Sequence, residues 1–341
     1  TEGARSLFRT TERSVGMLHG LKDCLRSHTK YGKSRYLNFL FRYDMGRYFH
    51  YSSMDRNSDE VQTETEIRLL IHSIEKALAL PAVRPGFGRE KIELLLQKYD
   101  SFRSFKECKN AKEIDMLVLG TIRSYIEFQR NSCPEFDLSF IPTQFRDMQD
   151  NDCVGVSSDS SCNFSDLSFS DFAKSRHSLR YYGSEPVQIE TIEKSISLAQ
   201  TAPSACNRQP VHVFACTNTE RIEMIMSFHG GIKGFGRPQA ILAVAGTLGS
   251  YTSEYERNTV YVDCGIFSMN LLYALHYYGL ATCPVIWGSE PDNDKKIRQI
   301  LGIPESETVA LLIMVGSYPP GEYRFAKAKR KDINSIFTVI D

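Results

Sequence analysis

Residues 201–216 (TAPSACNRQPVHVFAC) constrain the fold of this chain more than any other stretch. Pro203, Ser204 and Asn207 are turn-forming residues that end a helix and expose backbone amides. The residues that follow alternate as in a β-strand, with apolar side chains at Val211, Val213 and Ala215. The pattern predicts a helix, a polar turn and a strand, and such a turn suits a flat ligand with polar edges. An ordinary helix–loop–strand corner is the alternative interpretation of the segment taken alone.

Two further motifs flank this turn in the chain. Residues 174–182 (KSRHSLRYY) contain Arg176 and Arg180, which on a helical turn would share one face because they are four residues apart. Arginine suits a phosphate dianion because its forked guanidinium is permanently charged, although a solvated basic turn is the alternative. The other motif, residues 263–288, reads DCGIFSMNLLYALHYYGLATCPVIWG.

These three motifs resemble those of the nitroreductase-like flavoproteins. The turn resembles APSxxNxQPWxF, with Val211 where tryptophan is usual, and the basic motif resembles RxSxR. The third resembles DxGxxxxNLLLxAxxxGLGxCxxG, with matches at Asp263, Gly265, Asn270, Leu271, Leu272, Ala274, Gly279, Leu280 and Cys283. The resemblance covers about residues 172–341.

The resemblance implies an α+β fold for residues 172–341, with a mostly antiparallel sheet of four or five strands flanked by helices. It implies an FMN-dependent oxidoreductase that takes hydride from NADH or NADPH and reduces a small nitro, quinone or similar acceptor by a ping-pong mechanism. The flavin carries the chemistry, so we expect no obligatory catalytic side chain and no metal. A flavin-dependent dehydrogenase or oxidase of the same fold is one alternative. A non-catalytic flavin-binding protein whose helical half binds a partner is another.

The resemblance also implies which residues hold the cofactor. Residues 325–332 (FAKAKRKD) resemble the segment that closes on the phosphate, and Lys233 is the cation expected near the pyrimidine edge. Pro284 lacks an N–H, so Val285 or Ile286 is the expected donor to the reactive ring edge. The full FMN set is Arg176, His177, Ser178, Arg180, Pro203, Ser204, Ala205, Cys206, Asn207, Gln209, Lys233, Pro284, Val285, Ile286, Lys329 and Arg330. We expect Cys283 to be a small buried apolar residue rather than a redox thiol.

Residues 1–145 predict a helical domain, and the Ser- and Asp-rich residues 146–171 predict a linker. Thr63 and Glu66 form a capping box, and apolar residues then recur at helical spacing. On the polar side of that helix, a cluster predicts a solvated face or an interdomain contact, with a catalytic role as the alternative. Its members are His72, Glu75 and Lys76. We expect the loop 81–88 (PAVRPGFG) to act as a lid over the flavin, with Arg84 and Phe87.

The aromatic, basic residues 30–51 favour a helical layer over a base-stacking surface; the aromatics are Tyr31, Tyr36, Phe39, Phe41, Tyr43, Tyr48, Phe49 and Tyr51. Among 341 residues, 41 are basic and 41 acidic, so the charge argues against a nucleic-acid partner. No apolar run reaches the roughly 18–20 residues that span a membrane. The nine cysteines lack metal-binding spacing, which favours reduced thiols in the cytoplasm. The tail 333–340 alternates as a strand would, and in relatives such a tail joins the partner's sheet, so we expect a homodimer.

Overall fold

The computed structural model of the chain describes residues 30–51, 60–105, 111–146, 155–251, 254–288 and 290–340. The chain forms two compact units, residues 1–58 with 251–258 and residues 59–250 with 259–341. The sequence-based boundaries at residues 145 and 171 stay predictions about domain organisation. Within the described ranges, no helix combines the length and the apolar character that crossing a membrane requires.

The smaller unit joins a long helix to a short 3-10 helix. Tyr36 is buried, and its ring meets that of Tyr255 edge-on, with centroids 6.1 Å apart. The guanidinium of Arg257 donates two hydrogen bonds to the carboxylate of Asp44, at 2.7 and 2.9 Å. The elements are α2 (Lys30–Tyr51) and η4 (Glu254–Glu256). The basic, aromatic segment therefore forms a helix, as predicted; the side chains of Tyr43, Tyr48, Phe49 and Tyr51 lie outside the described residues.

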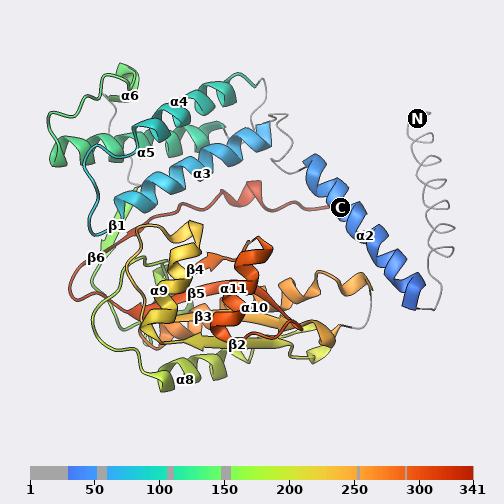
Figure 1. Cartoon of the computed structure of the whole chain (residues 1–341). Coiled ribbons are helices and arrows are strands. Elements are labelled where there is room, and N and C mark those ends of the chain that lie inside the picture. The colour runs from blue at the N-terminus through green and yellow to red at the C-terminus, as the bar shows by residue number, and fades with distance from the viewer. Residues whose placement is uncertain are drawn as a thin grey trace, which may run out of the picture. The chain divides into compact units, whose positions relative to one another are not determined.

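In the larger unit, a helical bundle surrounds an apolar core (Figure 1). The predicted periodicity is confirmed, because its apolar positions are at most 5% exposed: Ile67, Ile71, Ile74 and Leu78. The helices are α3 (Glu60–Leu78), α4 (Arg89–Arg103), α5 (Ala111–Ser132) and α6 (Thr143–Arg146). The capping box is wrong because α3 begins at Glu60, which leaves Thr63 buried inside the helix.

The loop 81–88 is anchored to the bundle. The hydroxyl of Tyr125 donates to the carbonyl oxygen of Phe87 at 2.7 Å, and the amide of Gly86 donates to Oε1 of Gln129 at 2.9 Å. The ring of Phe87 packs edge-on against Tyr125 and Phe128. These contacts turn Phe87 toward the bundle core, which argues against the expectation that it covers a flavin.

The larger unit also carries a four-stranded sheet in the order β2-β3-β5-β4, antiparallel throughout. Helix α10 packs on one face, where Val260 and Cys264 approach Gly246. Helices α9 and α11 cover the other face, where Ile222 and Ile297 share a core with β3 (Figure 1). The strands are β2 (Val211–Cys216), β3 (Ala240–Thr247), β4 (Leu280–Ile286) and β5 (Glu307–Ser317); the helices are α8 (Ile189–Ala199), α9 (Thr219–Phe228), α10 (Thr259–Tyr277) and α11 (Pro291–Leu301). The predicted α+β fold is confirmed.

A two-stranded antiparallel ribbon attaches the bundle to the rest of this unit. The buried carboxylate of Glu75 on α3 accepts hydrogen bonds from the amide of Gly155, at 3.0 Å, and from the backbone of Ala328. The guanidinium of Arg324 donates to the carbonyl oxygen of Leu80 at 2.7 Å. The strands are β1 (Val156–Asp159) and β6 (Tyr323–Ala326). The predicted linker thus contains a strand. Glu75 contacts the residue before that strand and the segment after β6, all within one compact unit, so its role in an interdomain contact stays a prediction.

Residues 176–183 run along the outer edge of β4. The amide of Leu179 donates to the carbonyl oxygen of Thr282 at 2.9 Å, which forms a parallel bridge between Ser178 and Thr282. Helix α7 (Phe169–Ser175) ends before Arg176, whose φ of −75° and ψ of 115° are extended. The segment from Arg176 to Arg180 is therefore not the helical turn on which the two side chains would share one face, because pairing with the sheet edge keeps it extended.

The tail does not form the predicted strand within the described chain. Residues Ile333–Ser335 form the 3-10 helix η5, and the carboxylate of Asp332 accepts a hydrogen bond from the amide of Asn334 at 2.9 Å. The alternating apolar side chains that follow are exposed: Ile336, Phe337, Val339 and Ile340. This local cap competes with extended pairing. Addition of the tail to a partner's sheet stays a prediction.

Candidate functional site

Arg176 and Arg180 lie on the extended segment beside β4, and each keeps one buried nitrogen without a hydrogen-bond partner in the described part of the chain. These atoms are Nη1 of Arg176 and Nε of Arg180. Arg180 is 7% exposed, and its other nitrogens contact the carbonyl oxygen of Ser178 at 3.2 Å and Nε2 of His72 at 3.5 Å. Burying a cation without its full set of acceptors is costly, so the geometry leaves donors for an anion.

The charges around Arg176 are of the same sign. Burial and the charge of Arg330 lower the pKa of Arg176. Burial and the charge of Arg176 lower the pKa of His177 to about 4, and the His177 imidazole stacks on Phe325 with centroids 3.6 Å apart. The structure thus brings Arg176 and Arg330 into one electropositive region, with a neutral His177 beside them. A bound anion would relieve the repulsion between the two guanidinium groups.

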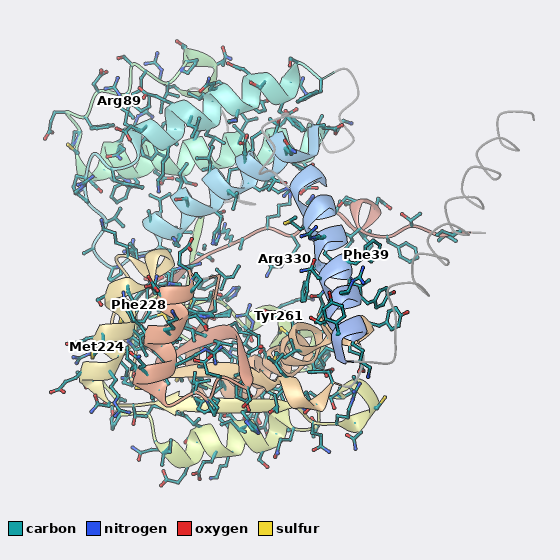
Figure 2. The ribbon with its side chains drawn as sticks, turned by 45° about the vertical axis from the view of Figure 1, so that its right-hand side comes forward. Phe39, Arg89, Met224, Phe228, Tyr261 and Arg330 are labelled. Carbon is teal, nitrogen blue, oxygen red and sulfur yellow. The ribbon has the colours of Figure 1, made fainter. Side chains whose placement is uncertain are left out.

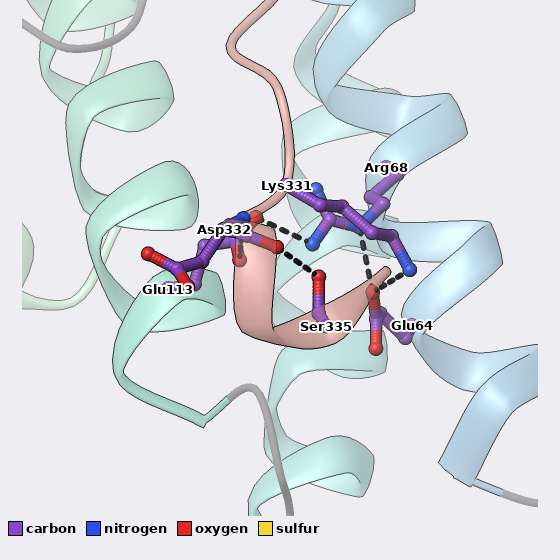
Figure 3. Close-up of polar contacts among 6 residues, drawn as sticks. All are labelled: Glu64, Arg68, Glu113, Lys331, Asp332 and Ser335. Carbon is purple, nitrogen blue, oxygen red and sulfur yellow. Dashed lines mark hydrogen bonds and ion pairs between the residues drawn. The ribbon is translucent and has the colours of Figure 1, made fainter. Parts of the chain in front are cut away.

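The segment 328–332, which carries Lys329 and Arg330, is held in place by contacts of Lys331 and Asp332 with the helical bundle. Nη1 of Arg330 donates to the carbonyl oxygen of Ala328 at 2.8 Å. Lys331 pairs with the buried carboxylate of Glu64 at 2.8 Å, and the amide of Asp332 donates to Oε2 of Glu113 at 3.3 Å (Figure 3). Figure 2 shows Arg330 between the bundle and the sheet. Anchoring on α3 and α5 therefore fixes where residues 328–332 lie.

A buried hydrogen-bond chain supports the other end of the site. Ser175 donates to the carbonyl oxygen of Phe172 at 2.9 Å, so its oxygen accepts from Nε2–H of His276 at 2.8 Å. Nδ1 of His276 then accepts from the hydroxyl of Tyr318 at 2.9 Å. Burial and the charge of Arg176 lower the pKa of His276 to about 4. Sequence reasoning missed this chain; a histidine among the mostly apolar buried residues of α10 was the available signal.

β4 is an edge strand, so alternate residues direct backbone groups to its outer side. The carbonyl oxygen of Thr282 accepts there from Leu179, and that of Ile286 lies 3.0 Å from Nε2 of His229. Because both backbone groups of one strand residue point to the same edge, Ile286 has its amide on the outer side and Val285 does not. A cavity of about 420 Å³ opens beside Ile286. The geometry favours Ile286 over Val285 as a donor to a ligand.

Cys283 is 2% exposed on β4, and burial raises the pKa of its thiol. Both properties fit the expectation of a small apolar residue. Lys233 is exposed directly after the 3-10 helix η2 (Gly230–Ile232), and its expected contact with a flavin stays a prediction.

The APS turn, residues 202–209, lies between helix α8 and strand β2, as predicted. Three of its residues adopt the left-handed conformation without being glycine: Cys206, Asn207 and Gln209. The amide of Ala205 donates to the buried carboxylate of Asp263 on α10, and the amide of Gln209 donates to Oγ of Ser204, both at 2.9 Å. A cavity of about 260 Å³ borders the turn and Phe267.

The structure therefore places the predicted residues in two groups. Arg176, His177, Ser178 and Arg180 gather with Arg330 near α3 and β4, whereas the APS turn packs on α10. Among the described residues, no hydrogen bond connects the APS turn with the group of Arg176, His177, Ser178, Arg180 and Arg330. Sequence reasoning did not assign His72 and Lys76 of α3 to this site, although it noted both on a polar helix face.

A sequence model of the nitroreductase family matches residues 173–244 and 231–317. A protein of Archaeoglobus fulgidus, named as a proposed NADH dehydrogenase/NAD(P)H nitroreductase, is 30% identical over 158 residues, covering 45% of this chain and 86% of the relative. A protein of the same name from Methanothermobacter thermautotrophicus is 32% identical over 152 residues, covering 43% and 74%.

Among solved structures, a protein of Parabacteroides distasonis described as a proposed NADH dehydrogenase/NAD(P)H nitroreductase aligns with a TM-score of 0.39 and 26% identity. That alignment covers 44% of this chain and 85% of the other. The family match includes the basic segment, the APS turn and β4, while α2 and the bundle lie outside it. Since the two sequence relatives match over most of their own length, this chain belongs to the nitroreductase family.

Proposed function

We propose that this chain is an FMN-dependent oxidoreductase that takes hydride from NADH or NADPH and passes electrons to a small organic acceptor by a ping-pong mechanism. The family and the names of its relatives support oxidoreductase function in general. The observation that carries the FMN proposal is the pair of buried guanidinium nitrogens, on Arg176 and Arg180, that have no hydrogen-bond partner in the described part of the chain. The FMN phosphate is a dianion, and forked, permanently charged donors suit it.

The residues present fit a bound FMN. Arg176 and Arg330 would hold the phosphate, Ser178 and Arg180 would bind next to it, and the amide of Ile286 would donate to the ring edge. When bound, the flavin supplies the hydride-accepting and electron-donating chemistry. The side chains of this site bind and orient the cofactor, and none is needed as a general acid or base.

We extend the proposal to a homodimer. Helix α10 exposes a row of apolar side chains, of which Tyr261 is labelled in Figure 2. Their exposed fractions are 54% for Tyr261, 57% for Val262, 42% for Ile266 and 39% for Met269. An apolar patch of this kind is typical of an interface between proteins. Since the APS turn packs on α10, burying this face in a dimer would bring the turn toward the partner's flavin.

The dimer is checked by light scattering on the purified, flavin-loaded protein. Removal of residues 335–341 should loosen it if the exposed apolar tail reaches the partner. A flavin-loaded monomer would contradict the dimer, and unchanged assembly after truncation would contradict the role of the tail.

We place the protein in the cytoplasm because the cysteines of the described part are free thiols: Cys133, Cys162, Cys206, Cys216, Cys264 and Cys283.

The function is tested on the absorption spectrum of the purified protein. We expect a flavin spectrum, or uptake of added FMN at micromolar concentration, and anaerobic bleaching by NADH or NADPH followed by recovery with a nitro or quinone acceptor. A protein that fails to take up FMN would contradict the proposal. FMN binding without bleaching by either nucleotide would favour the non-catalytic alternative.

A further inference from the structure

A cavity of about 200 Å³ lies in the helical bundle and is lined by residues other than those assigned to the flavin. Helix α5 contributes Arg123, Glu127 and Arg130 to its lining, and α6 contributes Phe145 and Arg146 (Figure 1). Both helices precede residue 173, where the family match begins. This bundle cavity is therefore a feature that the family match does not account for.

Positive charge exceeds negative charge around the bundle cavity. Three guanidinium groups border it, and the one carboxylate among the described lining residues is that of Glu127. A second carboxylate, that of Asp137, lies nearby: hydrogen bonds from Ser139 lower its pKa most, and the charges of Arg89 and Arg146 contribute. The guanidinium groups of the lining belong to Arg123, Arg130 and Arg146. Among these three cations and two carboxylates, one positive charge stays unbalanced, which favours an anionic ligand.

One donor of the bundle cavity is buried without an acceptor. Nε of Arg146 has no hydrogen-bond partner within the described ranges, while Nη2 donates to Oγ1 of Thr143 at 3.1 Å. Ile126 and Phe145, which are 4% and 6% exposed, form the apolar part of the lining. Leaving a charged donor unpaired and buried costs free energy, so a ligand that supplies an acceptor would be bound favourably.

The donors around the bundle cavity suit a phosphate group better than a carboxylate. Arg130 and Arg146 carry forked guanidinium groups on different helices, and Asn131 adds a side-chain amide. A phosphate offers at least three oxygens to such a set, whereas a carboxylate offers two. Arg123 has an interaction of its own, so we count only its charge. The volume is below the roughly 300–1,000 Å³ of pockets that enclose whole small-molecule ligands, which suits a compact anion.

We propose that the bundle cavity binds a phosphate group through Arg130, Asn131 and Arg146, independently of the flavin. The phosphate is either the free ion or the end group of a phosphomonoester, and both present at least three oxygens. Guanidinium forks bind phosphate oxygens in pairs, which fixes orientation as well as charge. The helical bundle thereby gains a ligand of its own, whose binding links α5 to α6 and stabilises the folded bundle.

Isothermal titration of the full chain with inorganic phosphate tests the site. Arg130→Gln and Arg146→Gln should each weaken binding about 10-fold, which is the typical value of a charged hydrogen bond. Arg130 is exposed, so its substitution keeps the test usable if that of the half-buried Arg146 impairs folding. Arg84→Gln is the control, because Arg84 is an exposed arginine of the loop 81–88 outside the cavity, and it should bind phosphate as the unaltered protein does.

Methyl phosphate and acetate identify the chemistry of the ligand. Methyl phosphate carries the phosphate as an ester, so binding at least as tight as that of inorganic phosphate assigns the site to a phosphomonoester. Weaker binding of methyl phosphate assigns the site to the free ion. Acetate should bind about 10-fold more weakly than inorganic phosphate, because it leaves a charged donor without an acceptor. Equal affinity for acetate would overturn the phosphate assignment.

Arg176→Ala separates the bundle cavity from the flavin site. It should retain the phosphate binding that Arg130→Gln weakens, because Arg176 follows α7 and does not line the cavity. Loss of all phosphate binding in Arg176→Ala would overturn the proposal, and so would equal dissociation constants in Arg130→Gln, Arg146→Gln and the unaltered protein. Absence of phosphate binding at millimolar concentration would overturn it as well. The proposed function fails by a different result, namely absence of FMN uptake by the unaltered protein.

Discussion

The APS turn and the basic segment 176–180 both match family motifs, yet the structure uses their polar groups differently. In the turn, Oγ of Ser204 accepts from the amide of Gln209, and Asp263 accepts from the amide of Ala205. In the basic segment, one nitrogen each of Arg176 and Arg180 is buried and finds no acceptor among the residues that the structure describes. The comparison shows a turn whose polar groups stabilise its own conformation and a segment whose donors remain available to a ligand.

The largest expected effect concerns the hydrogen-bond chain from Ser175 through His276 to Tyr318, which lies next to Arg176. Acid should lower the free energy of unfolding by protonating His276 in this chain. The folded-state pKa of His276 is about 4, below the ordinary 6.5, so the unfolded chain binds more protons between these values. The contribution of His276 to the free energy of unfolding is therefore fully present above pH 6.5. As the pH falls toward 4, this contribution is lost, which lowers the free energy of unfolding by roughly 3 kcal/mol. Urea unfolding at several pH values measures the loss.

His276→Gln should remove that part of the pH dependence and leave the part due to His177, whose pKa is also lowered to about 4. An identical pH dependence in His276→Gln and in the unaltered protein would show that the chain from Ser175 to Tyr318 does not titrate as inferred.

Arg176→Ala tests the basic segment directly. The loss of a charged hydrogen bond to phosphate should weaken FMN binding by about 1.5–3 kcal/mol, which is roughly 10- to 150-fold in the dissociation constant. Fluorescence titration with FMN measures it. Arg237→Ala is the control because Arg237 is exposed and pairs with Glu223 at 2.9 Å. An unchanged constant in Arg176→Ala would remove this residue from the site.

Asp263→Asn tests the turn. The substitution replaces a charged acceptor of the Ala205 amide by a neutral one, so the free energy of unfolding should fall by about 1 kcal/mol. Urea unfolding at pH 7 measures the change, with the exposed Asp292→Asn as the control. If stability is unaffected, this buried hydrogen bond does not hold the turn on α10.

Lys331→Gln should have the smallest effect. Lys331 is 41% exposed, and its ion pair with Glu64 spans 2.8 Å, so its loss should cost about 0.5 kcal/mol of unfolding free energy. FMN affinity should change little, because the amide of Asp332 still binds Glu113 and anchors the segment after Arg330. A loss of FMN affinity as large as that of Arg176→Ala would mean that this ion pair positions the phosphate site.

The sequence predicted the regular elements well where a local pattern decides them. Apolar spacing located the buried face of α3, and the Pro- and Asn-rich turn located the start of β2. It was wrong where pairing with a distant segment overrides local spacing. Arg176 and Arg180 are four residues apart, as on a helix, but hydrogen bonding of Leu179 to Thr282 keeps them extended. The tail alternates like a strand, yet the cap at Asp332 forms a short helix.

By itself the sequence determined the family, because its motifs carry the resemblance, and the residue types that suit a phosphate. The antiparallel α+β sheet was implied by that resemblance. The tertiary structure alone decided which donors remain without acceptors. It also decided that Ile286 rather than Val285 directs its amide outward, and that Lys76 lies beside Arg180. These properties depend on burial and on contacts between residues more than 100 positions apart in the chain, such as His72 with Arg180. The electrostatic cost of an unpaired buried charge arises only after folding has excluded water from it.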